Sequence, residues 1–201
     1  DRRACLATTP PMSLRPWTVI ETEPLIDYSP WLRVLRQEVE LPNGERIKDY
    51  LLTPARDYAM IVPITNAGEV VLVRQYKHGL GRIVLDFPAG YLETPSEDPL
   101  AAAQRELREE TGYTAASWTP LGAFALDTNR STTSAHLFLA QGLTPTHAQQ
   151  LDSTENLVFE LHPSSAILHL MQTGAMPGIG CPAAWGLAQL VLNSGHDTSS
   201  S

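Results

Sequence analysis

The segment Asp98–Gly112 constrains the fold more than any other part of the chain. Asp98 can cap a helix, Pro99 fits a first helical position, and Gly112 offers a C-terminal stop. Between them, apolar residues recur at helical spacing, namely Leu100, Ala103 and Leu107. The segment therefore predicts one amphipathic helix with defined ends.

The predicted helix carries a group of glutamates. Glu106, Glu109 and Glu110 lie three and four residues apart, so a helix gathers their carboxylates on one face. Like charges at this spacing repel unless a cation lies among them, and carboxylate oxygens favour Mg²⁺ or Mn²⁺. The alternative is a solvated face on which Arg105 and Arg108 pair with the glutamates.

The residues around this cluster form a longer pattern. Its parts are Phe87-Pro88-Ala89-Gly90, then Glu97, Arg105-Glu106-Leu107, Glu109-Glu110 and Gly112-Tyr113. This pattern closely resembles the Nudix box, a signature with many fixed positions. One departure is that six residues separate Gly90 from Glu97, one more than in the family pattern. The extra residue falls in the loop before the helix, so we expect it to bulge outward and to leave the helical register unchanged.

A second stretch, Leu72-Val73-Arg74-Gln75-Tyr76-Lys77, looks like the ADP-ribose pyrophosphatase branch of the Nudix family, which is similar over roughly residues 30 to 195. The resemblance implies a cofactor, Mg²⁺ or Mn²⁺, held by the side chains of Glu106, Glu109 and Glu110 and by the backbone carbonyl of Ala89. It also implies hydrolysis of the diphosphate of a nucleoside diphosphate sugar, with ADP-ribose as the leading candidate. Water would attack phosphorus in line and release a nucleoside monophosphate and a sugar phosphate.

The resemblance assigns further catalytic roles. Arg105 is expected to hold Glu109 in place. The general base is expected on a loop after the last sheet strands, where Thr154-Glu155-Asn156 is the matching region; Glu155 is the predicted base, with Glu160 as the second choice. The alternative for Glu155 is an exposed loop carboxylate, as most isolated glutamates are.

Four residues are predicted to contact the substrate. Arg74 and Lys77 end a predicted strand, where a cation can hold a phosphate oxygen, although alternation turns only one of such a pair toward the site. Asn129 and Arg130 lie in the polar loop Asp127–Thr133, which suits ligand recognition, and turn chemistry alone is the equal alternative.

His136, in an apolar strand, is left out of the catalytic set because a lone strand histidine is more often partly buried and hydrogen-bonded. Trp17, Trp31 and Tyr50 belong to the N-terminal region. In the resembling branch this region commonly packs on a second subunit and lends an aromatic or basic group to the substrate's base, so a homodimer is expected. Core or dimer contacts explain these aromatics equally well.

The rest of the chain predicts an α/β fold. Strands are expected over Leu32–Leu41, Arg46–Thr53, Tyr58–Ile64, Val70–Tyr76, Ile83–Phe87, Leu121–Leu126 and His136–Ala140, and helices over Ser164–Thr173 and Ala183–Asn193. With the resemblance, this order predicts a Nudix-type α/β/α sandwich with a mixed sheet, preceded by an N-terminal β-hairpin region. The expected divisions are a tail over 1–15, a β region and possible dimerisation element over 16–55, a Nudix domain over 56–195 and a tail over 196–201.

The composition of the chain limits the kinds of molecule that it can be expected to bind. The net charge of −8 argues against nonspecific attraction to nucleic acid or acidic membranes, so a polyphosphate ligand needs bound metal or a few placed cations. Cys5 and Cys181 lie far apart and suggest neither a disulfide scaffold nor a zinc site, and no run has the length of a membrane span, so a cytoplasmic setting is the default expectation.

Two rival functions remain open. Other Nudix branches act on oxidised nucleotides or other nucleotide derivatives. A non-catalytic Nudix regulator that binds nucleotides is the other rival, and it predicts losses among the box glutamates. Glu97, Glu106, Glu109 and Glu110 are all present.

Overall fold

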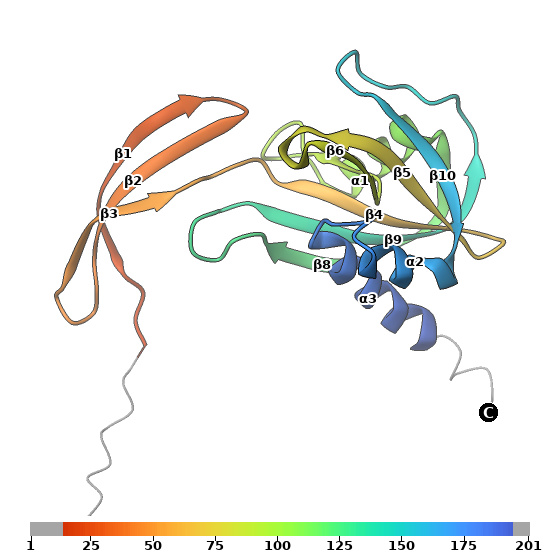
Figure 1. Cartoon of the computed structure of the whole chain (residues 1–201). Coiled ribbons are helices and arrows are strands. Elements are labelled where there is room, and N and C mark those ends of the chain that lie inside the picture. The colour runs from red at the N-terminus through yellow and green to blue at the C-terminus, as the bar shows by residue number, and fades with distance from the viewer. Residues whose placement is uncertain (1–13, 195–201) are drawn as a thin grey trace, which may run out of the picture. The chain divides into compact units, whose positions relative to one another are not determined.

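The computed structural model describes residues 14–194, which divide into two compact units (Figure 1). The first unit runs up to Ala55 and also includes Asn129–Ser131, and the second consists of Arg56–Thr128 and the chain from Thr132 onward. The predicted tail over 196–201 and most of the one over 1–15 lie outside the described residues.

The first unit is a three-stranded antiparallel sheet in the order β1-β2-β3. Strands β2 (Leu32–Glu40) and β3 (Arg46–Leu52) are the predicted hairpin, and Gly44 in their turn has a φ of 87°. Strand β1 (Thr18–Tyr28) was not predicted. Every residue of β1 is exposed, so the alternation that marks a half-buried strand is missing. The N-terminal β region is therefore a sheet of three strands, one more than a hairpin.

The second unit is built on a seven-stranded mixed sheet. Five strands follow the order β10-β5-β4-β9-β8, while β6 pairs with β5 and β7 pairs with β4. The β4–β9 pair is parallel and the other pairs are antiparallel. The strands are β4 (Tyr58–Thr65), β5 (Glu69–Lys77), β6 (Arg82–Asp86), β7 (Ala89–Tyr91), β8 (Tyr113–Ala125), β9 (Ser134–Pro145) and β10 (Leu157–Pro163), with a short helix η1 (His78–Leu80) between β5 and β6.

Sequence patterns found parts of this sheet and missed others. Strands β8 and β9 extend well beyond the predicted segments Leu121–Leu126 and His136–Ala140. Strand β7 has three residues, too few to show a period, and β10 is mostly exposed, so neither was predicted. Both strands lie against the helix Pro99–Thr111.

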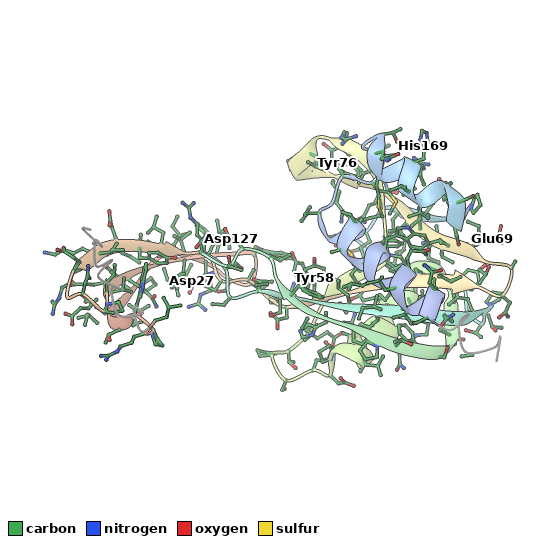
Figure 2. All side chains as sticks on the ribbon, turned by 90° about the horizontal axis from the view of Figure 1, so that it is seen from below. Asp27, Tyr58, Glu69, Tyr76, Asp127 and His169 are labelled. Atoms are coloured by element: carbon green, nitrogen blue, oxygen red, sulfur yellow. The ribbon has the colours of Figure 1, made fainter. Side chains whose placement is uncertain are left out.

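Helices cover both faces of the sheet, which confirms the predicted α/β/α sandwich (Figures 1 and 2). Helix α1 (Pro99–Thr111) packs on one face against a core that includes Ala59, Val71 and Leu107. Helices α2 (Ser164–Gln172) and α3 (Gly180–Ser194) cover the other face. No helix within residues 14–194 has the length and apolar character of a membrane span.

Helix α1 has the predicted ends. The Asp98 side chain accepts a hydrogen bond from the Leu100 N–H at 3.2 Å, and Gly112 ends the helix with a φ of 74°. A side chain at Gly112 would also overlap the backbone oxygen of His147. Local signals therefore fix where the glutamates fall on the helix.

Candidate active site on helix α1

Two glutamates of α1 are buried. Glu106 and Glu110 are 7% and 4% exposed, and they lie on the side of the helix that meets the sheet. Burial raises the pKa of Glu110 well above its ordinary range, and the nearby charge of Glu106 adds to this shift. Burial also raises the pKa of Glu106, although Arg105 opposes the shift. The site thus holds carboxylates in surroundings that disfavour their ionised form.

The short strand β7 brings backbone against these carboxylates. A Cβ atom at Gly90 would overlap the carboxyl group of Glu106, so only glycine permits this approach. The N–H of Ala89 donates a hydrogen bond to Oε2 of Glu110 at 3.1 Å. The Phe87-Pro88-Ala89-Gly90 stretch is therefore one wall of the carboxylate cluster.

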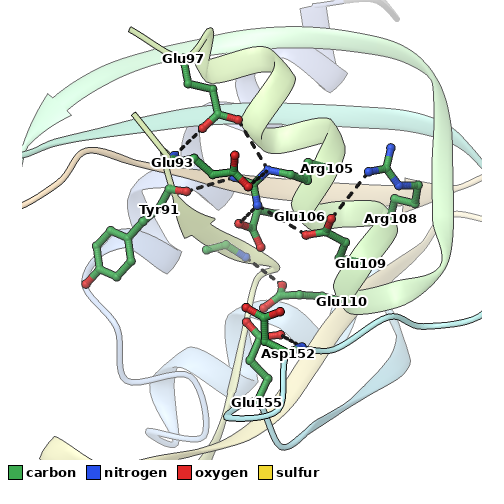
Figure 3. Close-up of polar contacts among 11 residues, drawn as sticks. Tyr91, Glu93, Glu97, Arg105, Glu106, Arg108, Glu109, Glu110, Asp152 and Glu155 are labelled. Carbon is green, nitrogen blue, oxygen red and sulfur yellow. Dashed lines mark hydrogen bonds and ion pairs between the residues drawn. The ribbon is translucent and has the colours of Figure 1, made fainter. Parts of the chain in front are cut away.

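Arg105 ties the helix to the preceding loop (Figure 3). Its Nη1 lies 2.6 Å from Oε1 of Glu106 and 3.4 Å from Oε2 of Glu109. Its Nη2 donates to the carbonyl oxygen of Tyr91 at 3.1 Å, and its Nε lies 3.5 Å from Oε1 of Glu97. Arg105 thus contacts Glu109, as the resemblance implied, but holds Glu106 more closely.

The loop 91–96, which holds the extra residue, leaves Glu97 in contact with Arg105. The N–H of Glu97 donates to the carbonyl of Thr94 at 3.1 Å, and the N–H of Glu93 donates to Oε2 of Glu97 at 2.5 Å. Glu93 also reaches Arg105, at 3.7 Å. The loop closes on itself before Asp98, so the helix begins where its cap predicts and the glutamates keep their register.

A loop after β9 is anchored on the C-terminal end of α1. The N–H of Gln150 donates to the carbonyl of Glu109 at 2.9 Å, and Nε2 of Gln149 donates to the carbonyl of Glu110 at 2.6 Å. The N–H of His147 donates to the carbonyl of Gly112 at 3.1 Å. These bonds satisfy carbonyls that a helix end leaves without helical partners.

The anchored loop brings Glu155 toward the carboxylates (Figure 3). Its charge contributes to the raised pKa of both Glu106 and Glu110. Its own Oε2 accepts the N–H of Asp152 at 3.0 Å. The predicted base therefore lies near the cluster, although more than forty positions separate them along the chain. Its catalytic role stays a prediction.

Glu160, the second choice for the base, lies in a different environment. Arg74 binds it with two nitrogens, one of them Nη2 at 2.8 Å from Oε2, and Nε2 of His162 lies 3.0 Å from the same oxygen. Arg74 holds the pKa of Glu160 at about 2. Such an acid is poorly suited to accept a proton near neutral pH. Arg74 is likewise engaged with Glu160, and its predicted substrate contact stays a prediction.

The other predicted substrate contacts fall in two places. Lys77 lies close enough to Glu110 for its charge to lower the pKa of that carboxyl. Asn129 and Arg130 belong to the first unit, where their backbone oxygens accept bonds from the Tyr50 hydroxyl at 2.5 Å and the Thr53 N–H at 2.6 Å.

His136 is half-buried, and its Nε2 lies 3.4 Å from Oδ2 of Asp57. This is the hydrogen-bonded arrangement expected of a strand histidine. It gives no reason to add His136 to the catalytic set.

The first unit contains a cavity of its own. Its volume is about 470 Å³, and its lining residues are Trp17, Ile47, Asp49, Tyr50, Leu51, Asn129 and Arg130. Trp17 and Tyr50 meet edge to face, with ring centroids 5.7 Å apart. The aromatic, acidic and basic groups of this lining suit a flat polar ring.

Within residues 14–194, no three acidic, histidine or cysteine side chains converge tightly enough to surround a metal ion as they stand. One oxygen of Glu106, Oε1, is engaged by Arg105. The donor set nevertheless fits a hard cation, because Glu106 and Glu110 are buried carboxylates and the charge of Glu106 raises the pKa of Glu110. The predicted metal site stays a prediction.

The family of the chain follows from comparison with family models. The NUDIX domain model matches residues 54–176, more than half of the chain. The chain therefore belongs to the Nudix family. Its N-terminal sheet matches a second model, the nucleoside diphosphate sugar hydrolase N-terminal domain, over residues 17–50.

Individual relatives of known name give a more specific comparison than the family models. The chain is 37% identical over 107 residues to an ADP-ribose pyrophosphatase of Bacillus subtilis, covering 53% of this chain and 57% of that protein. It is 39% identical over 119 residues to a methanol dehydrogenase activator of Bacillus methanolicus, covering 59% of this chain and 63% of the relative. The matched segments thus span less than two thirds of these relatives.

A solved structure extends the likeness to the whole fold. The crystal structure of an ADP compounds hydrolase superposes with a TM-score of 0.80 at 27% identity. The match covers 90% of this chain and 97% of the other. The mixed α/β Nudix fold with a three-stranded N-terminal sheet is therefore shared with that protein.

Proposed function

We propose that this protein is a divalent-metal-dependent hydrolase that cleaves the diphosphate linkage of a nucleoside diphosphate sugar. ADP-ribose is the first candidate substrate, with AMP and ribose 5-phosphate as products. The observation that carries the proposal is the buried pair Glu106 and Glu110 set against Gly90. The names of the relatives, ADP-ribose pyrophosphatase among them, support the choice of substrate.

The metal would be held by the side chains of Glu106, Glu109 and Glu110 with the carbonyl of Ala89. A bound Mg²⁺ or Mn²⁺ supplies positive charge to the diphosphate oxygens. The need for it is supported by the raised pKa of Glu110, since an unpaired buried carboxylate is costly without a neighbouring cation.

The chain's own groups perform the remaining steps. Glu155 accepts the proton of the attacking water, a role supported by its proximity to Glu106 and Glu110. Arg105 orients Glu106 and Glu109 through its guanidinium nitrogens. Lys77 places positive charge next to the same cluster. Burial behind β7 limits access of bulk water to the carboxylates.

The cavity of the first unit can accept a flat heterocycle. Trp17, Tyr50 and Arg130 line this cavity and can stack on or hydrogen-bond to a flat heterocycle. Asn129 supplies a further polar group there. A homodimer belongs to the same proposal, and sedimentation of the purified chain at several concentrations tests it.

The hydrolysis is tested with the purified full chain, ADP-ribose and Mg²⁺, by following release of AMP. Chelation of the metal is expected to stop the release, and Glu106→Gln to reduce it at least a hundredfold. Glu69→Gln is the matched control, since this glutamate lies at the start of β5, at the end of that strand away from Lys77 (Figure 2). Activity that survives Glu106→Gln would contradict the site.

A panel of nucleotide sugars and oxidised nucleotides separates the substrate from the chemistry. Cleavage of another nucleoside diphosphate compound without cleavage of ADP-ribose would replace the substrate and keep the mechanism. Nucleotide binding without any hydrolysis would favour a non-catalytic regulator.

A second candidate function is activation of a methanol dehydrogenase, which the likeness to the Bacillus methanolicus protein favours. It is tested by measuring methanol oxidation by such an enzyme with and without this chain. Glu106→Gln shows whether any activation needs the carboxylate cluster.

A further inference from the structure

The hairpin between β5 and β6 holds two cations face to face. Lys77 is the last residue of β5, Arg82 is the first of β6, and the register pairs them directly. Both side chains are exposed. Tyr76, one residue before Lys77, marks this end of the second unit in Figure 2. The hairpin therefore presents two positive charges at its closing turn.

The pair is unfavourable in the protein alone. Like charges directly opposite each other on antiparallel strands destabilise the pairing. Among residues 14–194, no carboxylate forms an ion pair with Lys77 or Arg82, although Asp and Glu outnumber Lys and Arg by 22 to 14 in the whole chain. An anion bound between the two side chains would remove this repulsion.

The pair lies on the side of the sheet that carries the carboxylates. Side chains alternate along β5, so Lys77 shares a face with Val71, which packs in the same core cluster as Leu107 of α1. Directly paired residues of neighbouring strands project from the same face of a sheet, so Arg82 projects from the same face as Lys77. Lys77 lies within electrostatic reach of Glu110, whose pKa its charge lowers, and also of Cys181 at the start of α3.

Arg74 does not share this position. Because side chains alternate along β5, Arg74 projects from the same face as Leu72, the face that α2 and α3 cover. Both carboxylate oxygens of Glu160 bind its guanidinium. The two cations of this hairpin that are available to a ligand on the α1 side are therefore Lys77 and Arg82.

We propose that Arg82 is a substrate-binding residue that, together with Lys77, binds the diphosphate of the substrate through its non-bridging oxygens. This inference rests on the proposed function and adds a residue and a role to it. The planar guanidinium can donate two parallel hydrogen bonds to a phosphate, while Lys77 acts as a point charge. Among the described residues Arg82 forms no ion pair with Glu106, Glu109 or Glu110, so its proposed contribution is to binding.

Steady-state kinetics of the full chain with ADP-ribose and Mg²⁺ test the proposal. Arg82→Gln is expected to raise KM about tenfold and to change kcat less than about threefold, as loss of a charge-assisted hydrogen bond predicts. Arg82→Lys is expected to recover part of the loss. Arg33→Gln removes one positive charge from an exposed strand of the first unit and is the matched control.

A second measurement separates binding from catalysis. Binding of α,β-methylene-ADP, a diphosphate that the enzyme cannot cleave at its bridge, is expected to weaken about tenfold in Arg82→Gln. Without ligand, the same variant is expected to be at least as thermally stable as the unsubstituted chain, because the repulsion from Lys77 is gone. A purely solvated Arg82 predicts no change in ligand binding.

The outcomes distinguish the two proposals. If no nucleotide sugar is cleaved but Arg82→Gln weakens binding of the analogue, the proposed function fails and the role of Arg82 stands. If cleavage proceeds with KM and analogue binding unchanged in Arg82→Gln, the role of Arg82 is wrong and the proposed function stands. A fall in kcat alone, or no binding of the analogue by the unsubstituted chain, also overturns the role of Arg82.

Discussion

Two acidic clusters of the second unit have opposite electrostatics. In the α1 cluster, burial and the charge of Glu106 raise the pKa of Glu110 well above its usual range. In the β5–β10 cluster, Glu160 receives two nitrogens of Arg74 and one of His162, and its pKa falls to about 2. Both clusters belong to the same sheet-and-helix sandwich.

The opposite pKa shifts of Glu110 and Glu160 indicate two different roles of a carboxylate, one in a functional site and one in stabilising the fold. Glu160 is compensated by its neighbours, so its ionised form strengthens the fold. For Glu110, the Ala89 N–H and the charge of Lys77 offset burial only in part, so ionising it weakens the fold unless a cation is bound. Buried, under-compensated acids that cluster against a conformationally special backbone are typical of functional sites. The predictions below test whether the contrast has this meaning.

The largest effect is expected from Glu110→Gln. This change should lower the rate of nucleotide sugar hydrolysis about a thousandfold, because it removes a charged oxygen from the proposed metal site. Without metal, the same variant should gain about 1 kcal/mol of unfolding free energy near pH 8, since a costly buried charge is gone. Rates come from AMP release and stability from urea unfolding.

The pH dependence of that gain has a defined sign. Folding raises the pKa of Glu110, so its protonated form favours the fold. The gain from Glu110→Gln should be absent below the ordinary pKa of glutamate, about 4.3, and grow as pH rises through the raised value. Added Mg²⁺ should stabilise the unsubstituted chain more than the variant. An equal metal effect on both proteins would contradict the metal-binding role of Glu110.

The next effect distinguishes two acids from the same part of the chain. Glu155→Gln should lower kcat at least about a hundredfold, as removal of a general base does. Glu160→Gln should change kcat less than about twofold, because Glu160 is already paired with Arg74. Both variants are assayed across pH 6 to 9. The reverse ranking would show that the ion-paired acid is the base.

A smaller loss of activity is expected from Gly90→Ala. The added methyl group must displace the Glu106 carboxyl, and misplacement by about an ångström costs roughly tenfold to a hundredfold in rate. The unfolding free energy should change by less than about 1 kcal/mol, because the end of a glutamate side chain can rotate away. Gly186→Ala, at an open position of α3, is the control and should leave activity unchanged.

The smallest effect concerns the compensated acid. Glu160→Gln should lower the unfolding free energy by about 1 kcal/mol at pH 7, a figure reduced for the solvent exposure of the pair. Because the pKa of Glu160 is lowered, this contribution is present above the ordinary glutamate range and should vanish as pH falls toward 2. Urea unfolding at pH 7 and at pH 3 measures the difference.

Local sequence signals predicted the parts of the site that are set by local geometry. Asp98 and Gly112 define the ends of α1, and the spacing of Glu106 and Glu110 then decides which side of the helix they share. These features depend on residues within one or two helical turns. The family pattern added Gly90, whose close approach to Glu106 explains why that position is glycine.

Contacts between distant segments could not be read from the sequence. Glu160 pairs with Arg74 because β10 lies beside β5, and β10 has too little alternation to be recognised as a strand. Asn129 likewise lies in the first unit, where its backbone oxygen accepts a bond from the Tyr50 hydroxyl, 79 positions away. Arg82 was not singled out because its importance lies in its register with Lys77.

The bonds from Gln149 and Gln150 to the end of α1 have a consequence for redesign. The segment 151–156 is fastened on one side to a helix terminus and on the other to β10, which begins at Leu157. Positions of this segment other than Asp152 and Glu155 can therefore be varied between two fixed ends, while Glu155 keeps its place near the glutamate helix. The two anchors thus allow the loop to be redesigned around a retained Glu155 on an unchanged scaffold.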